Sequence, residues 1–141
     1  MKTAILYNKD LARYSFGEGH PLTGDRFRLF FNFFNSKFNS LRDEFKVVEP
    51  KAATDEDLEL VHSRAYIKAI KSASEGKILL DIYRYVSSDN LNPSTGYIPE
   101  GIERGARIIV GISLWAGEMV AEGRFTKAVG IGGGMHHAKP H

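Results

Sequence analysis

Residues 126–141 read TKAVGIGGGMHHAKPH, and this stretch decides the fold that we expect. Its apolar run Ala128–Ile131 is short and bounded by turn residues, a pattern typical of a strand buried on both faces. The glycine loop that follows should therefore lie at the carboxyl end of that strand. Ligands bind at this edge of open α/β sheets, so His136 and His137 are candidate functional residues.

Upstream of this stretch, apolar patterns predict two more strands with a helix between them. Residues 3–7 and 46–49 are rich in β-compatible side chains and stop at polar residues or proline. Between them, phenylalanines recur at the three-and-four spacing of a helix over residues 26–41. We expect Asp25 or Thr23 to cap that helix.

Capping signals predict shorter helices in the middle of the chain. Thr54 is followed three residues later by a carboxylate, which is the pattern of a capping box. Ser63 can cap a second helix, and Gly76 can end it. Residues 77–86 have a helical apolar periodicity and are predicted as a further helix.

Residues 99–122 are predicted as one long helix laid on the sheet, with proline in its first turn and Gly123 as its stop. Gly105, Gly111 and Gly117 weaken a helix intrinsically, so we expect them to allow close packing. Strands and helices in this order predict an α/β fold with a parallel sheet and right-handed crossovers.

Composition narrows the class of protein. With 141 residues and 43% hydrophobic side chains, the chain is large enough for one core and is interpreted as one domain. Its 19 Lys and Arg against 17 Asp and Glu give a net charge of +2, which predicts no nucleic-acid partner. The absence of cysteine excludes disulfides, thiolate zinc sites and a cysteine nucleophile. No apolar run approaches membrane-spanning length, so we expect a cytoplasmic protein with no membrane partner.

Residues 130–141, GIGGGMHHAKPH, admit three chemical interpretations. Phosphate binding by the glycine amides would need a following helix, which the sequence does not offer. A metal site from His136, His137 and His141 is disfavoured, because adjacent residues of an extended segment point in opposite directions. Acid/base chemistry by the adjacent imidazoles is the third, since imidazole titrates near neutral pH. Against all three stands a pair of histidines with no chemical role.

The segment GGGMHHAKP, residues 132–140, resembles the Gly-Gly-x-His-His-Ala segment of the zinc-dependent histone deacetylase superfamily. The likeness is greatest to its acetoin-utilisation and acetylpolyamine deacetylase branch. TAILYN (residues 3–8), RYSFGEGHPLTGDRF (13–27) and LELVHSRAYI (58–67) are similar to family segments in the same order. The resemblance covers the whole chain. It implies an arginase/deacetylase-like, three-layer α/β fold with a parallel sheet, of which residues 1–141 form a single partial domain, truncated to the N-terminal portion.

The resemblance also implies a reaction, the hydrolysis of an acetylated amine such as acetyl-lysine or acetylpolyamine. In that family zinc polarises the acetyl carbonyl and its bound water attacks. By position His137 would be the general base and later the acid, and His136 would stabilise charge near the water. Arg26 would line the inner channel below the pocket. Gly133 and Gly134 would form part of the wall of the acyl-lysine tunnel.

The family's zinc ligands lie downstream of its histidine pair, beyond residue 141 of this chain. We therefore expect no metal ligands here, no zinc bound by this chain alone, and no activity unless a C-terminal half completes the site for its acetylated amine substrate. The family strand equivalent to residues 128–131 pairs with a strand that this chain lacks. Its open edge predicts a homo-oligomer. The alternative function is a non-catalytic, self-associating remnant or binding module of the same fold.

Overall fold

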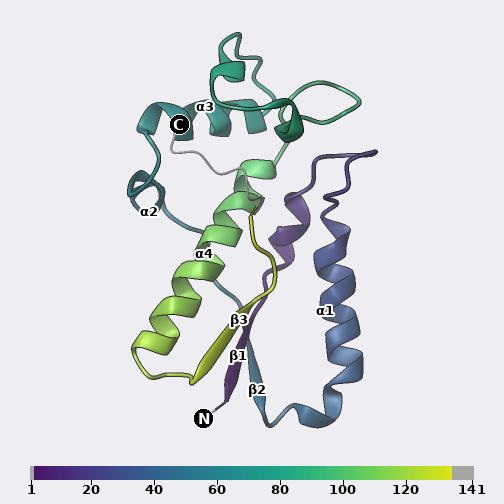
Figure 1. Cartoon of the computed structure of the whole chain (residues 1–141), viewed down its shortest axis with the longest axis vertical. Coiled ribbons are helices and arrows are strands. Elements are labelled where there is room, and N and C mark those ends of the chain that lie inside the picture. The colour runs from purple at the N-terminus through teal and green to yellow at the C-terminus, as the bar shows by residue number, and fades with distance from the viewer. Residues whose placement is uncertain (1, 135–141) are drawn as a thin grey trace.

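The computed structural model describes residues 2–134 of the chain, and these form a parallel sheet between helices (Figure 1). The sheet has three strands in the order β2-β1-β3, and both pairings are parallel. Its strands are β1 (Thr3–Leu6), β2 (Phe45–Val48) and β3 (Lys127–Gly130). Each lies within a residue or two of its predicted position, so the predicted α/β class is confirmed.

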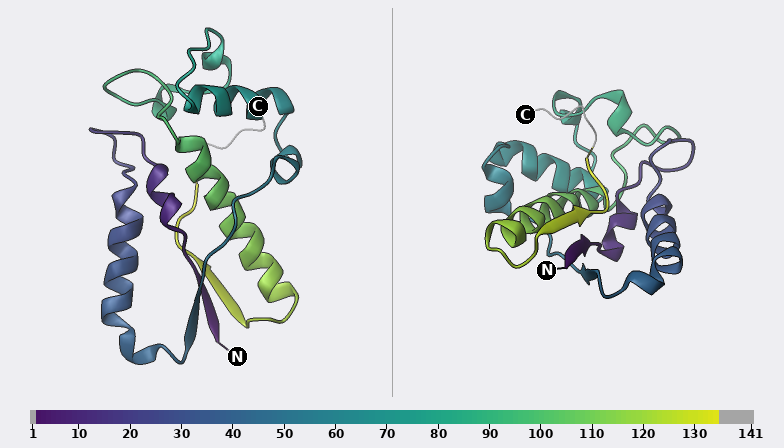
Figure 2. Two further views of the ribbon diagram at one scale, coloured as in Figure 1. Left: turned by 180° about the vertical axis from the view of Figure 1, so that it is seen from behind. Right: turned by 60° about the horizontal axis from the view of Figure 1, so that its bottom comes forward.

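Helices cover the two faces of the sheet and make three layers (Figure 2). On one face α1 (Asp25–Lys37) lies against β2 and β1, where Phe34 meets Phe45 with ring centroids 5.0 Å apart. On the other face lies α4 (Ile102–Ala121). A Cβ added to Gly130 would come within 2.4 Å of Ile112, so α4 contacts β3 closely. The predicted helices over residues 26–41 and 99–122 therefore exist and hold the sheet between them.

The buried core joins α4 to the sheet and to the first turn of α1. Its members are apolar residues of β1, of the segments that follow β1 and β3, and of α4, with one aromatic ring from α1. They are Ala4, Ile5, Leu6, Leu11, Phe27, Ile108, Ile109, Ile112, Met119 and Ile131. Within the described residues no helix is both long and apolar enough to cross a membrane.

The two capping predictions in the middle of the chain are confirmed. Helix α2 (Asp55–Glu59) begins with a capping box, in which the Asp57 backbone N–H donates to the Thr54 hydroxyl and the Asp57 carboxylate accepts from Thr54. Helix α3 (Arg64–Ser74) begins at Ser63, whose hydroxyl accepts from the backbone of Tyr66. These local hydrogen bonds are encoded by neighbouring residues, which is why sequence patterns predict them.

The helix predicted over residues 77–86 is wrong. The structure has only a 3-10 turn there, Ile82–Arg84, between irregular segments. Ile78 is 72% exposed and Leu80 is 95% exposed, whereas Ile82 is 8% exposed, so only part of this segment's apolar surface packs against the rest of the molecule. Helix stability depends mostly on such packing, and the periodicity alone is not enough.

The predicted cap of α1 is also wrong. Gly24 occupies the cap position and no side chain bonds to the free amides there. A Cβ at Gly24 would lie 1.8 Å from the carbonyl oxygen of Ala12, so the close approach of two backbones requires glycine. Asp25 instead accepts a hydrogen bond from Arg28 on the next turn.

Helix α4 begins three residues later than predicted, because Gly101 precedes it in the left-handed region with φ of 76°. The Ser74 hydroxyl, at the end of α3, accepts from the Glu103 amide and so supplies the missing cap. Gly105 and Gly111 do allow close packing, since added Cβ atoms would lie 2.5 Å from Tyr14 and 2.0 Å from Lys51. Gly117 does not, because no described atom lies within 4 Å of its would-be Cβ.

Candidate functional site

The carboxyl edge of the sheet is held together by Asn8, directly after β1. Its side-chain amide donates to the Pro50 carbonyl at 3.1 Å, and its carbonyl oxygen accepts from the Asp10 amide at 2.8 Å. Asn8 is only 9% exposed, and it joins the chain leaving β1 to the chain leaving β2. Sequence reasoning treated this residue only as the end of a strand. The signal for its role is an Asn soon after a strand, since Asn side chains commonly accept from the backbone amide two residues on in an Asx turn.

The segment that follows β3 is hydrogen-bonded to β1 at the same edge of the sheet. The Ile131 amide donates to the Leu6 carbonyl at 3.0 Å, and Ile131 is buried. Gly132 then adopts a φ of 105°, which L side chains rarely take. A Cβ there would lie 2.9 Å from the ring of Phe27 and 3.5 Å from Leu11. The glycine therefore lets β3 turn directly over the first helical turn of α1.

Gly133 and Gly134, the predicted tunnel residues, lie in open space after this turn. No described atom comes within 4 Å of a Cβ added at either position, and both residues are exposed. Such a loop lets a ligand approach the backbone. Their predicted role in substrate binding stays a prediction.

Arg26 lies next to this turn, in the first turn of α1. Its guanidinium carbon is 5.2 Å from the centroid of the Phe27 ring, which in turn borders Gly132. Arg26 is exposed among the described residues. The structure thus brings Arg26 to the neighbourhood of the glycine loop, and its role in a channel stays a prediction. His136 and His137, the predicted acid/base pair, lie outside the described residues.

An aromatic segment borders the chain after β1. The Phe16 ring is 3% exposed and lies 4.6 Å from the ring of His20 and 5.5 Å from that of Tyr14. His20 accepts a hydrogen bond from the Leu22 amide through Nδ1 at 3.0 Å. These contacts give the long loop before α1 a defined shape.

A second aromatic group belongs to α3. The Tyr66 ring lies 4.8 Å from that of His62 and 5.9 Å from that of Tyr85. Burial, helped by the nearby phenol of Tyr14, raises the pKa of Tyr66 above its ordinary value. Burial likewise raises the pKa of Tyr7, although Arg28 opposes it. Both phenols therefore keep their protons at neutral pH and can donate hydrogen bonds.

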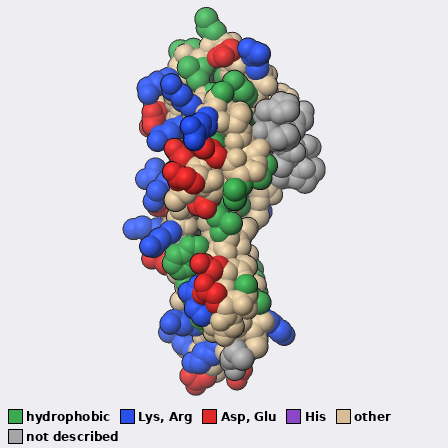
Figure 3. Space-filling model, turned by 90° about the vertical axis from the view of Figure 1, so that its left-hand side faces the viewer, with side chains coloured by type: hydrophobic (Ala, Val, Ile, Leu, Met, Phe, Trp, Pro, Cys, Tyr) green, Lys and Arg blue, Asp and Glu red, His purple; other side chains and the backbone are tan. Residues whose placement is uncertain are grey.

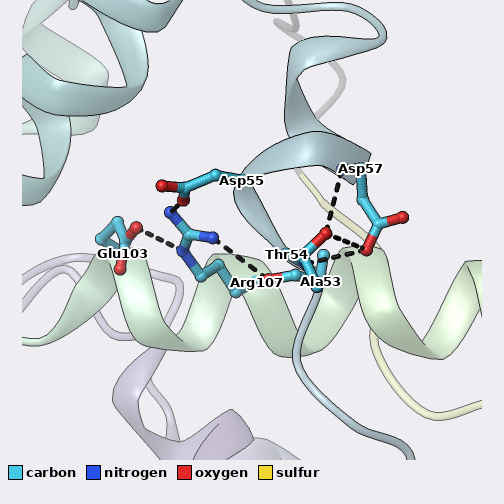
Figure 4. A network of polar contacts seen from close by, with 6 residues as sticks. All are labelled: Ala53, Thr54, Asp55, Asp57, Glu103 and Arg107. Atoms are coloured by element: carbon cyan, nitrogen blue, oxygen red, sulfur yellow. Dashed lines mark hydrogen bonds and ion pairs between the residues drawn. The ribbon is translucent and has the colours of Figure 1, made fainter.

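Arg107 of α4 fixes the chain between β2 and α2 (Figure 4). Its guanidinium donates to the carboxylates of Glu103 and Asp55 and, at 3.1 Å, to the carbonyl of Ala53. The Ala53 amide returns a bond to the Arg107 carbonyl at 3.0 Å. Sequence reasoning missed this network, because its partners Ala53 and Asp55 are 54 and 52 residues away from Arg107 in the chain. Glu103 four residues earlier is the only local signal.

Arg107 and Asp55 in this network stabilise each other's charged forms. Burial by itself lowers the pKa of Arg107, but the hydrogen bonds to Glu103 and Asp55 outweigh burial and raise the pKa overall. The hydrogen bond from Arg107 and its positive charge lower the pKa of Asp55. The network therefore stays ionised at neutral pH and holds the β2–α2 connection against α4.

The described part of the chain has no cluster of potential metal ligands, and the face drawn in Figure 3 carries charges of both signs. Among residues 2–134, no three His, Cys, Asp or Glu side chains gather in an arrangement that could hold a metal ion. On the face shown in Figure 3, Lys and Arg side chains lie beside Asp and Glu side chains, with hydrophobic side chains between them. The described residues of the candidate site are the open backbone of Gly133 and Gly134 and the neighbouring Arg26.

Comparisons with known proteins agree with this architecture. Residues 20–141 match the family model described as histone deacetylase domain. The chain is 34% identical over 140 residues to acetoin utilization protein AcuC of Staphylococcus aureus strain MSSA476, covering 99% of this chain. It is 30% identical over 135 residues to AcuC of Bacillus subtilis strain 168, covering 96% of this chain.

A solved structure shares the fold. The crystal structure of the HDA15 HD domain superposes with a TM-score of 0.68 at 18% identity, over 93% of this chain and 35% of that one. The chain spans 34% of the length of each of the two AcuC proteins.

Proposed function

This chain belongs to the histone deacetylase family, and from that premise we propose that it supplies the N-terminal part of a zinc-dependent enzyme that hydrolyses acetylated amines. Its substrate would be an acetylated amine such as acetyl-lysine or acetylpolyamine. The observation that carries it is the turn at Gly132, which places the described start of the family's glycine-rich segment, Gly132–Gly134, at the carboxyl edge of the sheet. Parallel α/β sheets bind their ligands at that edge.

The described residues support the binding part of this proposal. Gly133 and Gly134 leave room for an acyl chain along the backbone, since no described atom lies within 4 Å of their would-be Cβ atoms. Arg26 stands beside the same turn and would hold a positive charge below the pocket. Acid/base work would fall to His137, with His136 stabilising charge, because imidazole both takes and returns a proton near neutral pH.

Zinc would supply a polarised carbonyl and an activated water in such an enzyme. The described residues do not fit a zinc site, because no three potential ligands gather among residues 2–134. We therefore propose that ligands from beyond residue 141 complete the site. The chain spans about a third of the length of its relatives, which supports that division.

Zinc titration of the 141-residue chain tests directly whether the zinc ligands lie beyond residue 141. Equilibrium dialysis with zinc should give no tight stoichiometric site, and an acetyl-lysine reporter should show no turnover. A tight site with one zinc per chain, lost in His137→Ala and kept in His20→Ala, would contradict it. Reading the coding sequence past residue 141 is a second test, in which a continuation containing Asp-x-His agrees with the proposal and an immediate stop codon opposes it.

A second candidate function is a non-catalytic module that acts by self-association. The observation that favours it is the position of β3 at the edge of the described sheet. In that case no form of the protein should bind zinc tightly or hydrolyse the reporter. The protein should instead form a stable oligomer.

A further inference from the structure

Two long loops lie at the carboxyl edge of the sheet. One is the loop of residues 15–24, between the 3-10 turn η1 (Lys9–Arg13) and α1. The other is the loop of residues 91–101, which leads into α4. Because α4 runs back along the sheet and connects to β3 through a short turn, its first residues lie at the edge where the strands end (Figure 1). Loops at this edge are the ones that contact ligands in parallel α/β sheets.

The ends of the first loop are fixed beside the glycine turn. Leu11 before the loop and Phe27 after it both border Gly132, at 3.5 and 2.9 Å from an added Cβ. A Cβ at Gly24 would lie 1.8 Å from the Ala12 carbonyl oxygen, so the two ends of the loop also meet each other. The loop of residues 15–24 therefore starts and ends next to the candidate site.

Gly17, near the tip of the first loop, contacts Asn92 of the second. A Cβ added to Gly17 would lie 2.1 Å from Nδ2 and 2.8 Å from Cγ of Asn92. The φ of Gly17 is 92°, a backbone conformation that favours glycine. Its carbonyl accepts from the His20 amide at 3.3 Å, and the neighbouring Phe16 is buried, so the tip has a defined shape. Both views of Figure 2 show the two loops side by side.

Asn92 fixes the shape of its own loop. Its side-chain carbonyl oxygen accepts from the amides of Ser94 and Thr95, at 2.8 and 3.2 Å. Its backbone amide donates to the Tyr97 carbonyl at 2.8 Å. The Asn92 side chain cannot move away from Gly17 without losing hydrogen bonds that shape this turn. The contact therefore links two loops that are each held by their own hydrogen bonds.

We propose that Gly17 and Asn92 are positioning residues for the deacetylation, because their contact holds the two loops in one arrangement beside the glycine loop. This inference rests on the function proposed above, and neither residue has to touch the reacting atoms. Two loops that move separately would become ordered when an acetylated amine binds, and this ordering weakens binding. Loops that are already joined avoid that loss. The contact should therefore lower the KM and leave kcat nearly unchanged.

Gly17→Ala and Gly19→Ala form a matched pair of variants. Both glycines lie in the same loop at positive φ, 92° and 84°, so alanine meets similar backbone strain at either position. A Cβ at Gly19 has no described atom within 4 Å, whereas a Cβ at Gly17 meets Asn92. In the zinc-supplied product of the complete reading frame, Gly17→Ala should raise the KM for an acetyl-lysine reporter roughly threefold to tenfold, with kcat within about twofold. Gly19→Ala should keep the KM and kcat of the parent.

Shortening Asn92 tests whether the effect passes through this contact. In Asn92→Ser the hydroxyl can still accept from an amide two residues on, and the shorter side chain leaves room for a Cβ at position 17. The double variant Gly17→Ala/Asn92→Ser should therefore have a lower KM than Gly17→Ala alone. Effects of the two substitutions that simply add would overturn the proposal, because residues in contact should show coupling.

Hydrogen exchange on the same proteins gives a readout that needs no activity. The amides of residues 94–96 should exchange faster in Gly17→Ala than in the parent or in Gly19→Ala, because displacement of Asn92 frees them. Unchanged exchange there would refute the link between the loops. Turnover in the parent with equal KM values in the two glycine variants would refute the positioning role alone. A folded, zinc-loaded parent without turnover would refute the proposed function and, with it, the positioning role.

Discussion

Replacement of Arg107 by methionine should destabilise the fold far more than replacement of an exposed arginine. The Arg107 side chain is 11% exposed. Arg107→Met keeps most of its apolar stem and removes the guanidinium. Glu103, at 15% exposure, then loses its charged partner, and the Ala53 carbonyl loses a donor. Hydrogen bonds to charged groups contribute about 1.5–3 kcal/mol and neutral ones about 1 kcal/mol, so we expect a loss of about 3 kcal/mol. The exposed Asp55 adds little.

Arg124→Met is the matched control. Arg124 is 45% exposed and pairs with Glu118 and Glu122, which are 54% and 52% exposed. Its removal should change the free energy of unfolding by less than about 0.5 kcal/mol. Urea unfolding followed by circular dichroism at pH 7 measures both variants, at one protein concentration because association alters apparent stability. Equal losses in Arg107→Met and Arg124→Met would refute the reasoning.

Three further predictions concern the glycine turn and the titrating groups. Gly132→Ala should cost roughly 1–3 kcal/mol of unfolding free energy, because a Cβ there meets an aromatic ring at positive φ, while Gly133→Ala should cost little; equal urea midpoints would contradict this. The raised pKa of Tyr66 means that its phenol favours the fold below pH about 10 and that this contribution is lost as pH rises further. Tyr66→Phe should flatten the alkaline decline in stability and Tyr83→Phe should not. The lowered pKa of Asp55 favours the fold above pH about 4 and this contribution is lost as pH falls through the lowered value. Asp55→Asn should therefore reduce the acid dependence of the urea midpoint between pH 2 and 6, and an unchanged dependence would speak against the Arg107 contact.

Local signals in the sequence predicted the elements that local interactions stabilise. The capping residues Thr54 and Ser63 bond to amides three residues away, so their helices could be located from residue types alone. The apolar run near residues 128–131 likewise located β3. The expected burial of this strand on both faces is wrong for the described part of the chain, because Val129 is 49% exposed and Gly130 is exposed.

The remaining errors come from contacts between distant segments. Gly24 is required by the approach of Ala12, and the cap of α4 comes from Ser74 at the end of α3. Neither contact leaves a pattern in neighbouring residues. The segment 77–86 has helical periodicity, but Leu80 is 95% exposed and only part of the segment's apolar surface is packed. Tertiary context decides such positions.

The glycine loop of the candidate site could be predicted from the sequence. The residues that hold the neighbouring segments in place could not. The run Gly132–Gly134 after a strand pointed to an open backbone, and the structure has an open backbone at Gly133 and Gly134. Asn8 and Arg107 were missed, because each holds together segments whose proximity only the fold reveals. Family resemblance, rather than spacing, supplied the chemistry proposed for His136 and His137.

Hydrolysis of an acetyl-lysine reporter by the product of the complete reading frame, supplied with zinc, tests the central claim most directly. We expect turnover that His137→Ala abolishes and that the control His20→Ala retains, provided both variants unfold at the urea midpoint of the parent. A folded, zinc-loaded protein that gives no turnover, or turnover that survives in His137→Ala, would contradict it.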